Sequence, residues 1–319
     1  MTERMSGKIK IGVSSCLLGN EVRFDGGHKR DRYLTDTLAH YFDYLAVCPE
    51  VECGLPVPRE SMRLVGEVEK PRLVATKSGT DHTDRMENWA QKRVTELEKE
   101  KLCGFIFKSK SPSSGMERVK VYDKNSIPQS NGVGIFARIF KDHFPLLPVE
   151  EEGRLHDPLL RENFIEAVFV YVRWQDVIKI NKPAALVEFH TKHKYLLHAH
   201  NEELYRLMGK ITAEAGAESF SNRLEKYQTL LMQTLQTKPT RKKHINILQH
   251  LMGYFKNDLA GDEKAELLEI IDQYRDGNVP LIVPVTILNH YVRKYKQKYL
   301  QNQIYLKPHP IELRLRNHA

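Results

Sequence analysis

The side chains of this 319-residue chain that could do chemistry follow three short apolar runs in its first half. Cys16 comes after the first run, Cys48 and Glu50 come after the second, and Ser111 comes after the third. Cysteine thiolate is the ligand that soft metals prefer, and a nearby carboxylate can carry protons. Two cysteines at such positions predict a thiolate-ligated centre, although a free cysteine can equally pack as a small buried group.

Alternating strands and helices are predicted to position these residues. Strands are expected at 8–15, 44–47 and 103–107, and helices at 30–44, 84–101 and 132–144. Asp84 is the expected N-cap of the second helix. This order indicates a Rossmann-like α/β domain with a doubly wound, mostly parallel sheet. Because ligands of such sheets bind beyond the carboxyl ends of the strands, the three polar turns should converge on one site.

A polar segment that ends at Pro158 marks a change of pattern. We therefore predict an α/β domain over residues 1–153 and an all-α helical bundle over residues 154–319. Helices are expected near 158–176, 182–209, 218–236, 240–259, 262–275 and 282–302. In the last of them Tyr291, Tyr295 and Tyr299 recur every four residues, which predicts one helical stripe that either packs into the bundle or stacks on bases.

The net charge of +8 is concentrated in the second half of the chain. Residues 1–160 carry a net charge of +1, whereas residues 161–319 carry +7. This excess favours an anionic partner at the helical half. No apolar run reaches the ~18–20 residues of a membrane span, and the N-terminus lacks a signal-peptide core. We therefore expect a cytoplasmic protein with no membrane partner.

Several short motifs in the first half occur together. They are Ser15-Cys16-Leu17-Leu18-Gly19, Val22-Arg23-Phe24-Asp25-Gly26-Gly27, Cys48-Pro49-Glu50, Gly54-Leu55-Pro56 with Pro58-Arg59, and Ser111-Pro112-Ser113 with Gly115. With these motifs, residues 8–150 resemble the thiouracil desulfidase family. Residues 160–316 resemble the helical domain that is often fused to it. The fused arrangement resembles the tRNA 4-thiouridine desulfidases, which convert 4-thiouridine in tRNA to uridine.

The resemblance implies a [4Fe-4S] cluster that is held by three cysteines and has one open iron. It places two cluster ligands at Cys16 and Cys48, an acid/base carboxylate at Glu50 and a catalytic serine at Ser111. A thiocarbonyl sulfur is soft and suits an open iron, which withdraws electrons from the base carbon. Water then attacks that carbon and sulfide leaves, with no net redox change.

The third cluster ligand is where this chain departs from the family. The family has a cysteine at the position of Ser114, and a hydroxyl is a poor replacement for thiolate on iron. Three explanations are open: a deliberate substitution, a natural loss that leaves a silent RNA-binding protein, or replacement by Cys53 or Cys103. The intact remaining motifs favour the first. Cys103 opens the strand that leads to Ser111 and should lie at the other end of the sheet, so Cys53 is the better substitute.

Further residues are candidates for contacts with the expected substrate, tRNA that contains 4-thiouridine. Arg23 and Asp25 lie in a motif of the α/β domain, although a surface turn around Gly26 would use them equally well. The other candidates combine positive charge, which neutralises phosphate, with rings that can stack on bases. They are Lys194, Arg241, Lys243, His244, Tyr254 and Lys256.

Three functions compete. The leading one is an iron-sulfur-dependent desulfidase acting on 4-thiouridine in tRNA, which the helical half binds. The second is a catalytically silent RNA-binding protein, and the third is a small-molecule thiouracil desulfidase. Salt-sensitive tRNA binding separates the first two from the third. Because the target base must leave its stack, the enzyme needs a pocket for one pyrimidine near Cys16, Cys48 and Ser111.

Overall fold

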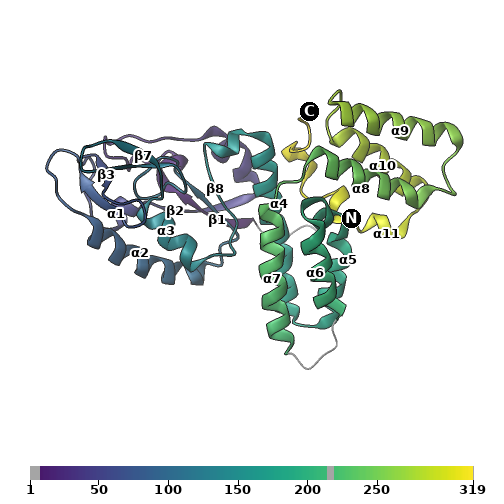
Figure 1. Cartoon of the computed structure of the whole chain (residues 1–319), viewed down its shortest axis with the longest axis horizontal. Helices are drawn as coiled ribbons and strands as arrows, with labels where there is room; N and C mark the ends of the chain where they lie inside the picture. The colour runs from purple at the N-terminus through teal and green to yellow at the C-terminus, as the bar shows by residue number, and fades with distance from the viewer. Residues whose placement is uncertain (1–7, 214–218, 319) are drawn as a thin grey trace. The chain divides into compact units, whose positions relative to one another are not determined.

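The computed structural model describes residues 8–213 and 219–318 (Figure 1). The chain divides into two compact units, Met1–Asp157 and Pro158–Ala319, whereas the sequence placed the boundary at 153/154. Pro158 begins the first helix of the second unit, α4 (Pro158–Ile180). A proline suits this position because its missing N–H would have no partner within the helix. The expected helix start at residue 218 lies outside the described residues.

A four-stranded parallel sheet forms the frame of the first unit. Its strands are β1 (Ile9–Ser14), β2 (Phe42–Val47), β5 (Phe105–Phe107) and β8 (Val149–Glu151), in the order β2-β1-β5-β8. Ile11, Val13 and all three residues of β5 are buried, as expected for strands of a covered parallel sheet. The predicted α/β class is confirmed, and the carboxyl ends of β1, β2 and β5 lie at one edge.

A second four-stranded sheet was absent from the sequence prediction. It consists of β3 (Met62–Val65), β4 (Arg72–Ala75), β6 (Val119–Tyr122) and β7 (Pro128–Gly132), in the order β4-β3-β6-β7. The pairs β3–β4 and β6–β7 are antiparallel, and β3–β6 is parallel. These strands are short, and β7 reads Pro-Gln-Ser-Asn-Gly, a composition typical of a turn.

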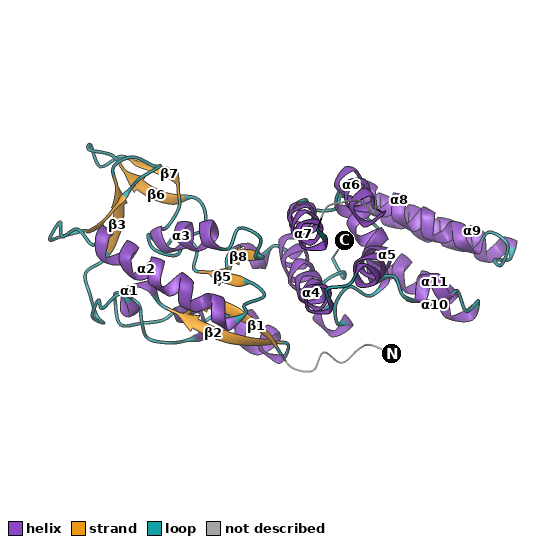
Figure 2. Ribbon diagram, turned by 90° about the horizontal axis from the view of Figure 1, so that it is seen from below, coloured by secondary structure: helices purple, strands orange, loops and turns teal. Residues whose placement is uncertain are grey.

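Two helices pack against the sheets of this unit. They are α2 (Thr83–Leu97) and α3 (Ile135–His143), which lie side by side in Figure 2. Phe136 and Phe140 of α3 contact the rings of Phe105 and Phe107 in the first sheet. A buried cluster joins the second sheet to both helices through Leu64, Leu73, Met86, Val119, Val121 and Ile135. The core of this unit therefore lies around α2 and α3.

Two local expectations in the first unit were wrong. The helix expected at 30–44 is only a π-helical turn, Tyr33–Thr37, and a 3-10 turn, Leu38–His40, because strand β2 already begins at Phe42. Asp84 is not the N-cap of α2, since the helix starts at Thr83. Asp81 instead accepts hydrogen bonds from the backbone N–H and the hydroxyl of Thr83.

The second unit is helical throughout its regular elements, as predicted. After α4 come α5 (Pro183–His200), α6 (Glu202–Ala213), α7 (Phe220–Gln236), α8 (Arg241–Met252), α9 (Gly261–Asp276), α10 (Ile282–Lys294) and α11 (Lys298–Gln301). Two expected helices are split. One breaks at Asn201, whose side chain accepts a hydrogen bond from the Leu204 backbone N–H, and the other breaks after Lys294. Among the described helices, none is both long and apolar enough to cross a bilayer.

Candidate functional site

The carboxyl ends of β1, β2 and β5 surround a cavity of about 390 Å³. Cys16 follows β1, Cys48 and Glu50 follow β2, and Ser111 and Ser114 follow β5, and all five line this cavity. Residues that are far apart in sequence are thus brought to one place. The convergence expected from the parallel sheet is what the structure shows.

Short turns fix the cysteine backbones. Cys16 lies in a 3-10 helix, Ser15–Leu18, which ends at Gly19 with φ of 97°, a left-handed conformation that glycine adopts without strain. The Cys16 carbonyl also accepts a hydrogen bond from the Lys29 N–H at 2.9 Å. Cys48 is the N-cap of the short helix α1 (Pro49–Glu52). Its N–H donates to Glu52 Oε1 at 2.8 Å, and this carboxylate also pairs with Arg93.

The segment 111–115 is held against the start of α3. The carbonyls of Pro112 and Ser113 accept hydrogen bonds from the N–H groups of Ile135 and Ala137. The backbones of Gly134 and Ser113 are so close that a Cβ on Gly134 would lie 2.5 Å from the carbonyl carbon of Ser113. This docking on a rigid helix determines where Ser111 and Ser114 stand in the cavity.

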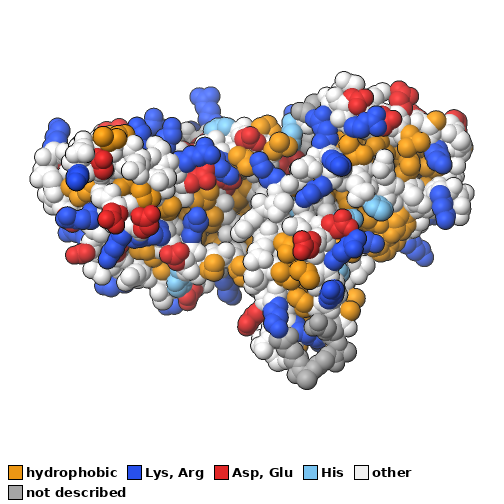
Figure 3. Space-filling model, viewed as in Figure 1, with side chains coloured by type: hydrophobic (Ala, Val, Ile, Leu, Met, Phe, Trp, Pro, Cys, Tyr) orange, Lys and Arg blue, Asp and Glu red, His pale blue; other side chains and the backbone are white. Residues whose placement is uncertain are grey.

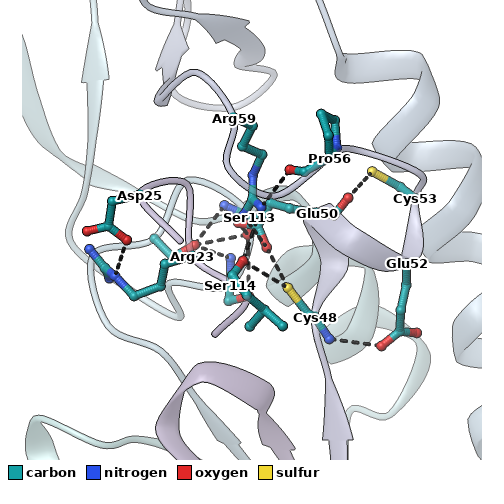
Figure 4. Close-up of polar contacts among 12 residues, drawn as sticks. Arg23, Asp25, Cys48, Glu50, Glu52, Cys53, Pro56, Arg59, Ser113 and Ser114 are labelled. Atoms are coloured by element: carbon teal, nitrogen blue, oxygen red, sulfur yellow. Dashed lines mark hydrogen bonds and ion pairs between the residues drawn. The ribbon is translucent and has the colours of Figure 1, made fainter. Parts of the chain in front are cut away.

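Glu50 lies at the centre of the polar contacts in Figure 4. Ser113 Oγ donates to Glu50 Oε1 at 2.6 Å, and the Cys48 thiol lies 3.5 Å from Glu50 Oε2. Arg59 Nη2 is 3.9 Å from the same Oε2. Ser111 Oγ is in turn 2.9 Å from Ser113 Oγ. A continuous set of hydroxyls therefore links Ser111 to the carboxylate.

Both cavity cysteines hold their protons strongly. Burial, together with the negative charge of Glu50, raises the pKa of Cys16 to about 11 and that of Cys48 to about 12. In the metal-free chain both groups are therefore thiols at neutral pH. A bound cation would have to displace these protons, which is the usual coupling between metal binding and thiol ionisation.

The donor set falls one thiolate short of a three-cysteine cluster site. Ser114, in the third position, is buried and presents a hydroxyl. The Cys53 thiol donates instead to the Glu50 backbone carbonyl at 3.2 Å, and Figure 4 shows its sulfur apart from that of Cys48. Neither Cys53 nor Cys103 lines the cavity. Within residues 8–213 and 219–318, no three His, Cys, Asp or Glu side chains are grouped to hold a metal.

The cavity also has a basic lining that the sequence analysis did not predict as a group. Besides Arg23, its lining residues include Lys29, Arg59, Lys108 and Lys110. Lys108 pairs with Glu152, whereas Lys29 and Lys110 are exposed and form no ion pair in the described parts of the chain. Asp25 does not line the cavity but lies 3.4 Å from Arg23. The net charge of the whole first half, only +1, does not indicate this local excess of positive charge at the cavity.

Sequence reasoning also missed Ser113, which is fully buried and makes the direct contact with Glu50. The Ser111-Pro112-Ser113 sequence did indicate a tight turn. In such a turn the hydroxyls of both serines can point toward the same site. Ser111, by contrast, reaches Glu50 through Ser113.

Three of the six helical-unit residues predicted to contact tRNA, all of them in α8, contact other parts of that unit. Lys243 Nζ donates to the His200 carbonyl, His244 Nδ1 lies 2.9 Å from the Tyr305 hydroxyl, and the Arg241 guanidinium lies over the Tyr274 ring. Burial lowers the pKa of His244 to about 3, so it carries no charge for phosphate. Each of these three motif residues therefore has a packing or capping role within the unit, and their contact with tRNA stays a prediction.

The other three predicted tRNA contacts, Lys194, Tyr254 and Lys256, are more accessible to a nucleic-acid partner. Tyr254 and Lys256 are exposed, and Lys194 is half-buried with its ammonium over the Tyr195 ring. Tyr254 stacks on Tyr299 with a ring separation of 5.5 Å. On the face shown in Figure 3, Lys and Arg side chains are spread among Asp and Glu side chains.

The tyrosine stripe expected on one helix does not form. Tyr291 is buried in α10, Tyr295 follows the end of that helix and donates to Glu263 Oε2 at 2.6 Å, and Tyr299 lies in α11. The Tyr291 and Tyr295 rings still stack, with their centroids 6.1 Å apart, whereas the break after Lys294 places Tyr299 in a separate helix. Tyr291 packs in the bundle, and Tyr299 stacks on Tyr254.

Comparison with known proteins gives matches to each half. Residues 11–152 match the family described as 2-thiouracil desulfurase, and residues 194–310 match a family described as a protein of unknown function (DUF1722). The uncharacterized protein YbgA of Escherichia coli (strain K12) is 28% identical over 134 residues, which is 42% of this chain and 79% of YbgA. The uncharacterized protein YbbK of Bacillus subtilis (strain 168) is 31% identical over 110 residues, or 33% of this chain and 72% of YbbK.

One solved structure is similar to part of the chain. It is the [4Fe-4S]-dependent thiouracil desulfidase TudS, with 30% sequence identity. The match covers 47% of this chain and 95% of that protein, with a TM-score of 0.39.

Proposed function

The chain belongs to the 2-thiouracil desulfurase family, and on this premise we propose that it is a desulfidase that replaces the sulfur of a thiolated pyrimidine with oxygen from water. The observation that carries the proposal is the convergence of Cys16, Cys48, Glu50 and Ser111 on one cavity of about 390 Å³, a size suited to a small ligand. The thiocarbonyl carbon gains oxygen from water, and the sulfur leaves as hydrogen sulfide. Atoms balance without an oxidant or a reductant.

A [4Fe-4S] cluster is the cofactor that we propose for this site, as in the name of the similar solved desulfidase. Cys16 and Cys48 offer two thiols to it, and the Ser114 hydroxyl stands in the third position. Because a hydroxyl binds iron less well than thiolate does, this donor set does not fit the cluster fully. The variant Ser114→Cys would supply the third thiol.

The chain's own residues provide proton transfer and positioning. Glu50 carries a carboxylate into the cavity, and its Oε1 is held by the Ser113 hydroxyl. It is placed to take a proton from the attacking water and to return one to the departing sulfur. The Ser111 hydroxyl, joined to Ser113, is placed to hold the water or the pyrimidine ring.

The substrate that we propose is 4-thiouridine in tRNA. The exposed Lys29 and Lys110 and the partly exposed Arg23 at the cavity support an anionic substrate, because a free thiouracil base has no phosphate for them to neutralise. The net charge of +7 over residues 161–319 supports a polyanionic partner for the helical unit. The exposed Tyr254 and Lys256 there offer stacking and phosphate contact.

A second candidate is favoured by one residue. With Ser114 in place of the third thiol, the chain would retain its basic cavity and bind thiolated RNA without turnover. In that case the chain is a reader of the modification.

The experiment compares three substrates under anaerobic conditions. Thiolated tRNA, 4-thiouridine 5′-monophosphate and free 4-thiouracil are each incubated with the iron-loaded Ser114→Cys variant, and sulfide release is measured. The proposal predicts turnover of tRNA at the lowest substrate concentration. Turnover of free 4-thiouracil with equal efficiency would contradict the tRNA assignment, and binding of tRNA without any sulfide release would favour the reader.

A further inference from the structure

Phe24 is a large apolar side chain that the fold leaves exposed at the cavity. It is 41% exposed, and it is the one aromatic residue among the described residues that line the cavity. Apolar rings of this size are normally buried, and a single exposed ring needs no explanation by itself. The position of Phe24 on the wall of the cavity, next to the Arg23 guanidinium, suggests a role in binding.

The backbone around Phe24 is pinned to the site. The Phe24 carbonyl accepts a hydrogen bond from the Arg59 N–H at 2.8 Å, and the Val22 carbonyl accepts one from Arg59 Nη1 at 3.1 Å. The Val22 carbonyl is also 3.9 Å from the Cys48 sulfur. The Phe24 backbone is thereby held at a fixed position relative to Cys48 and Glu50, and the ring projects from it partly exposed.

The Arg23 guanidinium lies 5.4 Å from the centroid of the Phe24 ring. It also lies 3.4 Å from Asp25, which fixes its orientation. An aromatic ring that carries a cation over one face, on the wall of a cavity, matches a nucleotide, because the other face of the ring can stack on the base while the cation meets the phosphate.

On these observations we propose that Phe24 is a binding residue that stacks on the face of the thiolated pyrimidine as it enters the cavity. This inference rests on the proposed function and names how the site holds the base. Stacking holds the ring in place without reading its edges, which leaves the thiocarbonyl free to face Cys16 and Cys48.

The test measures equilibrium binding of 4-thiouridine 5′-monophosphate to the metal-free full chain and to variants at Phe24. We expect Phe24→Ala to weaken binding about tenfold or more, as for loss of one base–aromatic stack. Phe24→Tyr and Phe24→Trp should bind nearly as well as the parent chain. Phe24→Leu is the matched control, since it keeps apolar bulk without an aromatic face, and it should resemble Phe24→Ala. The exposed position makes unchanged folding the expectation, checked by an unchanged Tm.

A spectroscopic signal gives a second readout. In Phe24→Trp, a stacked base should quench the new indole emission on addition of uridine 5′-monophosphate. The parent chain, whose Trp89 and Trp174 do not line the cavity, is the control and should show little change.

The outcomes separate this inference from the proposed function. Normal nucleotide binding by Phe24→Ala, or by Phe24→Leu, would overturn stacking while leaving the desulfidase proposal intact. Weakened binding of thiolated tRNA together with unchanged binding of the mononucleotide would also overturn it, because Phe24 would then contact a neighbouring base. Absence of mononucleotide binding by the metal-free parent chain would contradict the stacking, whereas the proposed function is contradicted separately, by lack of sulfide release from thiolated tRNA.

Discussion

Ser113 Oγ donates a 2.6 Å hydrogen bond to Glu50 Oε1, which ties the turn after β5 to the turn after β2. Ser113 is fully buried, so water cannot replace it. Its hydroxyl also contacts Ser111 Oγ at 2.9 Å. The orientation of the carboxylate and the position of the Ser111 hydroxyl therefore depend on one side chain that touches neither the cavity nor the solvent.

The first prediction concerns this positioning role. In the Ser114→Cys background, Ser113→Ala should lower kcat by about tenfold to a hundredfold while KM changes little, since the lost contact orients a proton-transfer group. Steady-state kinetics on thiolated tRNA measures both constants. Ser113→Thr keeps the hydroxyl and should recover part of kcat. A rise in KM with unchanged kcat would show that Ser113 serves substrate binding instead.

The second prediction concerns Gly134, which supports the loop that carries Ser114. A Cβ there would lie 2.5 Å from the Ser113 carbonyl carbon and 2.8 Å from the Ser114 nitrogen. Gly134→Ala should destabilise the first unit by about 1–3 kcal/mol, as overpacking of a rigid contact does, and should reduce iron retention in the Ser114→Cys background.

The matched control is Gly261→Ala, where nothing lies within 4 Å of the added Cβ. This change, at the first residue of α9, should leave stability within about 0.5 kcal/mol of the parent, as expected for a surface substitution. Equal urea midpoints for Gly134→Ala and the parent chain would contradict the close docking of this loop.

Part of this architecture could be predicted from the sequence because parallel strands have a strong signature. Strand β5 is a continuous apolar run, β1 places Ile9, Ile11 and Val13 in the core, and the turns that follow the two strands hold Cys16 and Ser111. The edge at which strands of a parallel sheet end then follows from topology. The second sheet could not be predicted, since its short strands are half polar and its pairing is fixed by tertiary contacts around Met86 and Ile135.

The candidate site was predictable in type but not in detail. The motifs place Cys16, Cys48 and Glu50, whereas the contact between Ser113 and Glu50 joins residues 63 positions apart. In the helical unit, composition cannot distinguish a basic residue that caps a helix from one that binds phosphate. Lys243 shows this, because its ammonium caps the carbonyl of His200.

The third prediction concerns the exposed lysines at the cavity. Lys29→Ala and Lys110→Ala should each weaken tRNA binding and lower the slope of log K against log salt by about one, the loss of one phosphate contact. Fluorescence anisotropy over a range of salt concentrations measures this slope. Lys124→Ala, an exposed lysine that does not line the cavity, is the control and should keep the parent slope. If Lys29→Ala and Lys110→Ala showed the same salt dependence as Lys124→Ala and the parent chain, the RNA would not contact the cavity lysines.

The fourth prediction concerns acid stability of the helical unit. Burial lowers the pKa of His193 and His244 to about 3 and that of His190 and His309 to about 4, from an ordinary 6.5. The folded state then binds fewer protons than the unfolded state, so the stability present above pH 6.5 is lost as the pH falls below it. Each group contributes a slope of up to about 1.4 kcal/mol per pH unit.

The carboxyl of Glu162 changes the free energy of unfolding in the opposite direction. Burial raises the pKa of Glu162 to about 7 against the attraction of Arg316, so its contribution grows as the pH falls from 7 toward 4.5. Four histidines outweigh it, and the free energy of unfolding should decrease by several kcal/mol between pH 7.5 and pH 5.5. Urea unfolding of Trp89→Phe, in which Trp174 alone reports on the helical unit, measures this change. Stability that is constant or higher at pH 5.5 would contradict the burial of neutral histidines.

The most direct test of the desulfidase assignment is nucleoside analysis of thiolated tRNA after anaerobic incubation with the iron-loaded Ser114→Cys variant in water enriched in the heavy oxygen isotope. Conversion of 4-thiouridine to uridine that carries the heavy oxygen is the predicted result, with little or no conversion by the parent chain or by Ser114→Cys with Glu50→Gln. Intact 4-thiouridine in a variant that has bound iron and tRNA would contradict the account.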